Sequence, residues 1–221
     1  MKKLTVDKAH AFLTEALRLN PGPWGAHSRY AAAAARIIAG HIGLDPDLAE
    51  AYGIVHDIGR RNGVTQMRHA VDGYEFMMRE GYPGAARICL THSFPTFCAD
   101  EALGEWDCTA EEYRSVEKFL SETRPDTMDR LIQMCDALAM PTGFTVIDRR
   151  LIDVALRYGV DENTTKRRKA FFKIQIDFES RIGRSVYSLL PGIEKNALEP
   201  TALYMEHICS AKTKTVSSFS E

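Results

Sequence analysis

The chain has 221 residues, of which 45% are hydrophobic and 26% charged, as in a soluble globular protein. A chain of this length can bury a substantial core, and we expect a single domain spanning residues 1–221. The 28 basic and 30 acidic residues give a net charge of −2, so charge gives no reason to expect a nucleic-acid polymer or an acidic membrane as partner.

Apolar residues at helical spacing predict helices along nearly the whole chain, and no segment predicts a strand. Two prolines in NPGPWG, residues 20–25, separate the first predicted helix from the second. Gly59 stands where a glycine that ends a helix is expected. The helices of the first half are expected at Val6–Leu19, 27–42, 46–56 with Asp45 as the cap, 69–79 and 85–92.

The second half continues the helical pattern. Thr109 and Glu112 form a predicted capping box for a helix that ends near Ser121. The remaining helices are expected from Asp126 or Thr127 to a stop at Pro141, at 148–158, and from 165 to about 189. The polar tail SAKTKTVSSFSE is expected to fray. The predicted fold class is therefore all-α, and a composition shift near Pro141 predicts additional C-terminal helices at about 141–209 after the core.

The sequence also predicts where the protein resides. Two lysines near the start are not followed by an apolar segment, so no signal peptide is predicted, and no apolar run approaches the length of a membrane span. The five cysteines are odd in number and form no CxxC pair, which is typical of reduced thiols. We expect a cytoplasmic protein without a membrane partner, and homo-oligomerisation stays open.

His56 and Asp57 stand side by side at the end of an apolar helix. His56 shares a face with Leu48 and Tyr52, and Asp57 lies about 100° further around the helix. Charged residues rarely enter such a face unless they are paired or bind a metal. A core histidine hydrogen-bonded to backbone is the alternative, but it leaves the adjacent carboxylate unexplained.

Four further residues are candidate metal ligands. Asp136 interrupts the apolar LIQMCDALAM segment, where an ionised carboxylate needs a cation or strong donors. His92 lies on an apolar face, although a hydrogen-bonded core histidine would fit there too. His27 follows a rigid turn and could be a helix cap, while His69 opens a helix and could be a solvated loop histidine. Imidazole and carboxylate groups from separate helices are ligands for Fe, Mn, Co, Ni or Zn. The remaining histidines have structural interpretations: His10, His41 and His207.

The order of these residues resembles the HD superfamily of metal-dependent phosphohydrolases. The resemblance covers about residues 20–140 and includes the extended motif HDIG at 56–59. It implies a helical fold and one divalent metal, with a second metal in the members that carry two extra histidines between the HD pair and the last aspartate. By this resemblance the first metal is held by His27, His56, Asp57 and Asp136, and the second by Asp57 as a bridge with His69 and His92.

The resemblance implies hydrolysis of a phosphoester or phosphoanhydride by metal-activated water. The expected substrate is a small phosphorylated metabolite, a nucleotide in our interpretation. Asp57 would orient the water, and Arg60 and Arg61 would offset the developing negative charge, although both could be surface arginines at a helix end. The basic stretch KRRK at 166–169 could meet a polyphosphate or simply be a solvated face.

Two other classes of function fit the same ligand residues. Some HD-type proteins are di-iron oxygenases, which would bind iron and consume oxygen. The domain could instead be a nucleotide-sensing module that binds its ligand without turnover. No residue in the sequence excludes either class.

Overall fold

The computed structural model describes residues 2–198, and within them the chain is helical almost throughout. The predicted all-α class is confirmed. The helices are α1 (Val6–Leu19), α2 (Trp24–Ile42), α3 (Pro46–Val55), α4 (Arg68–Arg79), α5 (Pro83–Thr91), α6 (Ala110–Glu122), α7 (Thr127–Ala137), α8 (Ile147–Tyr158), α9 (Thr164–Ile182) and α10 (Glu194–Ala197). The short elements are the 3-10 turns η1 (Ile58–Asn62), η2 (Ala99–Glu101) and η3 (Val186–Leu189), and strands β1 (Ala139–Met140) and β2 (Gly143–Phe144).

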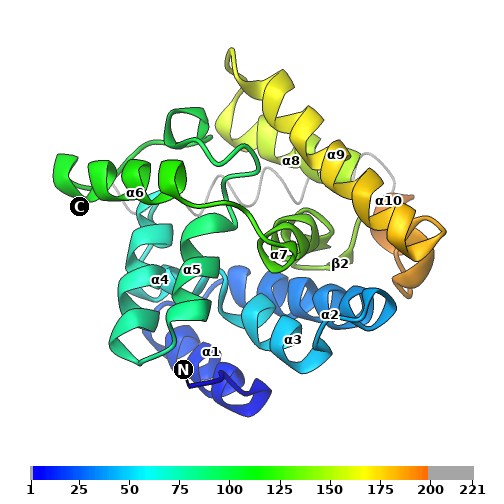
Figure 1. Ribbon diagram of the computed structural model, residues 1–221, viewed down its shortest axis with the longest axis horizontal. Coiled ribbons are helices and arrows are strands. Elements are labelled where there is room, and N and C mark those ends of the chain that lie inside the picture. Colours follow the sequence, from blue (N-terminus) through cyan, green and yellow to red (C-terminus); the bar gives the residue numbers. More distant parts are fainter. Residues whose placement is uncertain (1, 199–221) are drawn as a thin grey trace.

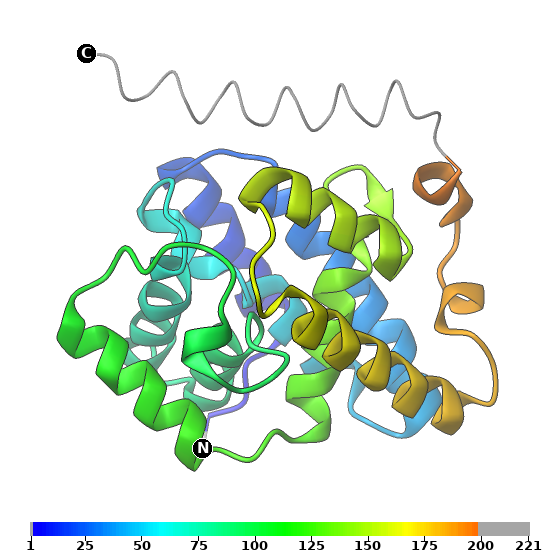
Figure 2. The ribbon, with the colours of Figure 1, turned by 90° about the horizontal axis from the view of Figure 1, so that it is seen from above.

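The helix α7 lies at the centre of the bundle (Figure 1). It contacts α2, α3, α5 and α9, and Leu131, Ile132, Met134 and Cys135 are fully buried along it. In Figure 1, α2 and α3 lie on one side of α7 and α8 and α9 on the other. Figure 2 places α6 and α9 on opposite halves of the molecule. The carboxyl end of α7 is thereby enclosed by helices from both halves of the chain.

Small residues let α2 and α3 pack unusually close together. The α2 residues that face α3 include Ala32, which is buried. A Cβ at Gly53 would lie only 2.5 Å from the Cα of Ala32, so only glycine fits there. Because of this close packing, the start of α2 lies beside the end of α3, where His27 and His56 stand.

Most predicted elements agree with the structure, and the capping box of Thr109 and Glu112 is present. Our expectation of no strand was wrong, because β1 and β2 form a two-stranded antiparallel sheet around Pro141. The predicted helix 165–189 ends at Ile182, where Gly183 adopts a left-handed φ of 76°. The predicted role of Gly59 was also wrong, since it lies within η1 at the junction with α4. The polar tail, His207 and Cys209 lie outside the described residues.

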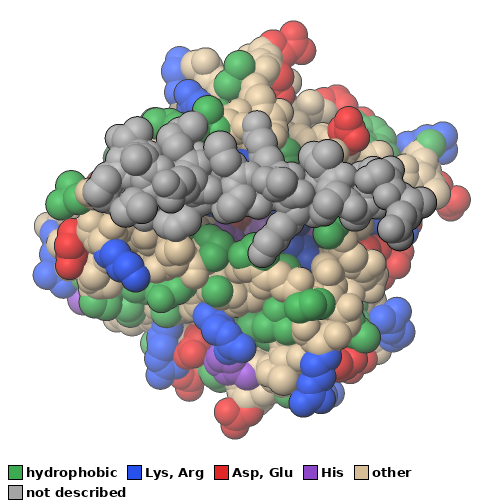
Figure 3. All heavy atoms as spheres, turned by 180° about the vertical axis from the view of Figure 1, so that it is seen from behind, with side chains coloured by type: hydrophobic (Ala, Val, Ile, Leu, Met, Phe, Trp, Pro, Cys, Tyr) green, Lys and Arg blue, Asp and Glu red, His purple; other side chains and the backbone are tan. Residues whose placement is uncertain are grey.

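The surface of the described part is mixed in charge. On the face seen in Figure 3, basic and acidic side chains are interspersed around the rim with apolar ones between them. Among residues 2–198, no helix combines the length and the apolar content that crossing a membrane requires.

Candidate metal centre

The six predicted ligand residues converge on one place, because all of them lie at helix ends that meet there. His27 is in the first turn of α2, and His69 is the second residue of α4. His56 and His92 are the residues that directly follow α3 and α5. Asp57 precedes η1, and Asp136 is in the last turn of α7. All are buried except Asp136, whose side chain is 22% exposed.

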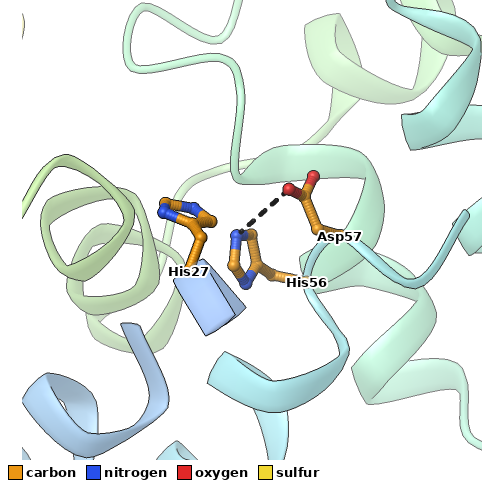
Figure 4. A group of neighbouring side chains, drawn as sticks. All are labelled: His27, His56 and Asp57. Atoms are coloured by element: carbon orange, nitrogen blue, oxygen red, sulfur yellow. Dashed lines mark ion pairs between the residues drawn. The ribbon is translucent and has the colours of Figure 1, made fainter. Parts of the chain in front are cut away.

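One group of side chains joins α2, the end of α3 and α7. Figure 4 shows the rings of His27 and His56 side by side, with the Asp57 carboxylate directed toward His56. The His56 Nε2 lies 3.9 Å from the Asp57 Oδ2, and the His27 Nε2 lies 2.9 Å from the Asp136 Oδ1. One ligand atom from each of His27, His56 and Asp57 can be chosen so that all lie within 4.8 Å of one another. This spacing suits coordination of a single ion.

A second group shares Asp57 with the first. The Asp57 Oδ1 lies 3.4 Å from the Nε2 of His69 and 3.5 Å from the Nε2 of His92. The two Nε2 atoms are 3.3 Å apart. These three residues again offer ligand atoms within 4.8 Å of one another. Asp57 therefore stands between two potential ligand groups, one at each of its oxygens.

All four histidines are oriented in the same way by backbone carbonyls. The Nδ1–H of His56 donates to the Gly53 carbonyl at 2.7 Å, and that of His92 to the Cys89 carbonyl at 2.8 Å. His69 donates to the Gln66 carbonyl, and His27 to that of Ala139 in β1 at 3.2 Å. A carbonyl only accepts, so the proton lies on Nδ1 and the Nε2 lone pair faces the cluster. Histidine ligands of metals commonly have such an anchor on the second ring nitrogen.

Two buried atoms in the cluster lack a hydrogen-bond partner: the Nε2 of His56 and the Oδ1 of Asp57. Leaving a buried polar atom unpaired costs about 1–3 kcal/mol, so such atoms are rare unless a ligand satisfies them. Both unpaired atoms are good ligands for a divalent transition metal. The residues present therefore fit a metal ion.

The electrostatics keep His56, His69, Asp57 and Asp136 in the form that binds metal, whereas for His92 the neighbouring Asp57 outweighs burial and raises the pKa. Burial lowers the pKa of His56 to about 4 and, together with Arg60, that of His69 to about 3, so both rings are neutral at pH 7. Burial alone would raise the pKa of Asp57, but Arg60 and the surrounding histidines hold it well below its usual value. Burial likewise opposes ionisation of Asp136, but the neighbouring His27, together with His56 and Arg150, holds its pKa below the usual value. Neutral imidazoles and ionised carboxylates need no deprotonation before coordination.

The two arginines that follow the HDIG motif have different positions. The Arg60 Nε donates to the Asp57 Oδ2 at 2.8 Å, and Arg60 lines the pocket described below. Arg61 points elsewhere, with its guanidinium 3.9 Å from the Phe76 ring centroid and paired with Glu15. The expectation that both arginines face the site is therefore corrected for Arg61, because stacking on Phe76 directs it away.

A pocket opens from the cluster toward the C-terminal helices. His69, His92 and Asp136 line its inner end. Arginines line much of the rest, and they come mainly from α8 and α9: Arg60, Arg150, Arg157, Arg167 and Arg168. Between them lie apolar and aromatic side chains, including Leu151, Val154, Tyr158 and Phe171.

Sequence reasoning missed Arg150 and Arg157, which α8 brings to the pocket. Arg150 lies 3.7 Å from the Asp136 Oδ1 and 2.7 Å from the Asp153 Oδ2. The spacing of seven between the two arginines places them on one helical face, which is a weak signal because solvated faces share it. The KRRK stretch is divided by the structure, since Arg167 and Arg168 line the pocket whereas Lys169 is exposed.

Comparison with known proteins agrees with this geometry. The family model described as the HD domain matches residues 24–140, more than half of the chain, and this segment contains all six converging residues. No curated protein and no solved structure matches the chain. HD domains bind divalent metals and are generally phosphohydrolases. This chain belongs to the HD-domain family.

Proposed function

We propose that this protein is a metal-dependent phosphohydrolase that cleaves a phosphoester or phosphoanhydride of a small phosphorylated metabolite, a nucleotide. The observation that carries the proposal is the buried cluster in which Asp57 stands between two ligand groups. Its two triads offer ligand atoms within 4.8 Å. The cluster lies at the inner end of a pocket rich in arginine, which favours a negatively charged substrate.

A divalent ion in this site supplies a bound water of lowered pKa and a Lewis acid for a phosphoryl oxygen. His27, His56, Asp57 and Asp136 would hold one ion, and His69 and His92 would hold a second together with Asp57. Fe, Mn, Co, Ni and Zn all suit this set of nitrogen and oxygen ligands.

The chain's own residues would orient the reaction. Asp57 is fixed by the Nε of Arg60 at its Oδ2, which leaves the Oδ1 directed toward His69 and His92. This carboxylate would orient the attacking water. Arg60 and Arg150 are the cations nearest to the ligand carboxylates, and they would stabilise charge that develops on the phosphoryl oxygens. Tyr158 and Phe171 offer aromatic surfaces to a nucleoside base.

The test is elemental analysis of the purified protein combined with phosphate release from nucleoside mono-, di- and triphosphates and cyclic nucleotides. Wild type should carry two transition-metal ions and release phosphate. His92→Ala should lose one ion, and Asp57→Ala should lose both and all activity. His41→Ala, at the exposed end of α2, is the matched control and should behave as wild type.

Other outcomes would support the alternative classes. Full activity in a folded Asp57→Ala protein would overturn the proposal. Iron content with oxygen-dependent turnover and no phosphate release would indicate the oxygenase class. Nucleotide binding without turnover at any of the metals would indicate a sensing module.

A further inference from the structure

The outer wall of the pocket comes from helices beyond the family match, which ends at residue 140. On α9, Thr164, Arg168 and Phe171 follow one another at spacings of four and three, so they share the helical face that lines the pocket. This helix contributes none of the six ligand residues. Any group recognised there lies apart from the metal centre.

Four of the five pocket arginines pair with acidic side chains. Arg60 pairs with Asp57. Arg150 and Arg157 share Asp153, each at 2.7 Å. Arg167, whose side chain is 8% exposed, pairs with Asp161 at 2.7 Å and donates to the Glu101 carbonyl.

Arg168 is the exception. It lines the pocket half-buried, and its side chain has no hydrogen bond or ion pair with any residue that the structure describes. An arginine carries five N–H donors in a fork that suits a phosphate oxygen pair. Within residues 2–198, no protein acceptor satisfies these donors.

Arg168 lies near the N-terminal end of α9. The first turn of this 19-residue helix contains no acidic residue, and Asn163 makes no side-chain capping hydrogen bond. A helix N-terminus carries partial positive charge, which disfavours cations nearby and favours anions. Lys166 pairs with Glu101 and Arg167 with Asp161, whereas Arg168, in the second turn, has no acidic partner among the described residues.

We propose that Arg168 binds an anionic group of the substrate other than the phosphoryl group at the metal centre, so the substrate class is compounds with at least two phosphate groups. This inference rests on the proposed function. Arg60 and Arg150 lie beside the carboxylates of the candidate metal centre, so they are placed to contact the phosphoryl group there. Arg168 stands on a different helix and contacts none of them. A diphosphate or triphosphate places a second charged group within the same pocket.

The test compares binding of pyrophosphate and inorganic phosphate, measured by calorimetry on the metal-loaded protein and again after chelation. The variant is Arg168→Gln and the matched control is Lys169→Gln, which removes the same charge from an exposed neighbour outside the pocket. Arg168→Gln should weaken pyrophosphate binding about tenfold or more, the scale of one charge-assisted hydrogen bond. Its melting temperature should stay within about 2 °C of wild type, because no hydrogen bond or ion pair with a described residue is removed.

Inorganic phosphate, which engages the metal centre alone, should bind Arg168→Gln and wild type equally well. Unchanged pyrophosphate affinity in Arg168→Gln, or an equal loss in Lys169→Gln, would overturn the inference. If the wild-type protein carries no metal or releases no phosphate, the proposed function itself is contradicted, which is a different result from either outcome above. The difference between the two glutamine variants should persist in chelated protein, because Arg168 does not contact the ligand residues.

Discussion

Replacing Gly59 with alanine should destabilise the protein strongly, because the glycine lets the η1 turn touch the backbone of α4. A Cβ at this position would lie 2.0 Å from the carbonyl oxygen of His69, 2.5 Å from the nitrogen of Gly73 and 2.9 Å from the carbonyl carbon of His69. All three are backbone atoms, so rotating a side chain cannot relieve the clash. Overpacking typically costs about 1–3 kcal/mol, and we place this case at about 3 kcal/mol or above.

For a chain of this size, that cost lowers the melting temperature by about 6–12 °C. The variant should also lose one metal ion, since α4 must move and carries His69 with it. Thermal unfolding and elemental analysis measure the two effects. Gly40→Ala is the control: this glycine lies exposed inside α2, and its Cβ would come no nearer than 4.0 Å to Pro46. That change should stabilise by about 0.5–1 kcal/mol. A Gly59→Ala protein that melts with wild type and keeps both ions would refute the reasoning.

Two further predictions concern buried charge. Asp129, fully buried in α7, accepts from the Thr91 hydroxyl at 2.9 Å and from Arg87, so Asp129→Ala should lower the free energy of unfolding by about 3–5 kcal/mol in urea titrations. Asp126→Ala, at the exposed cap, should cost only about 1 kcal/mol, and equal losses would contradict this account. Because burial lowers the pKa of His56 to about 4 and that of His69 to about 3, the unfolded chain binds more protons below pH 6.5. Chelated wild type should therefore lose stability from pH 7 to pH 5, and less so in His56→Ala; an equal fall in both would argue against it.

Four candidate ligands were predictable because each places a polar group on an apolar helical face: His56, Asp57, His92 and Asp136. His27 and His69 lie at helix starts, and the resemblance to the HD superfamily added them to the ligand set. His56 and Asp136 contradict their apolar surroundings in the sequence itself, and the structure brings them together with His27. Asp129 was missed because an acid at the third position of a helix is explained by capping alone, and the Asp126 capping box is indeed present.

The arginines that line the pocket could not be predicted from the sequence, and the reason is a different one. Arg150 and Arg168 lie on amphipathic helices, and a polar face that lines a pocket has the same pattern as one that faces bulk solvent. Only the packing of α8 and α9 distinguishes them. Gly59 illustrates the same limit, since its place after a predicted helix suggested a terminating turn, whereas tertiary contact with α4 determines its role.

The division of the pocket between two stretches of chain has a consequence for how such proteins diversify. The candidate ligand residues all precede residue 140, whereas most of the pocket arginines follow it, on α8 and α9. Under the proposed function, exchange of α8 and α9 would therefore change the substrate preference while the candidate metal centre stays the same. A chimaera carrying the α8–α9 segment of another HD-domain protein should keep its metal content and acquire the donor's substrate preference.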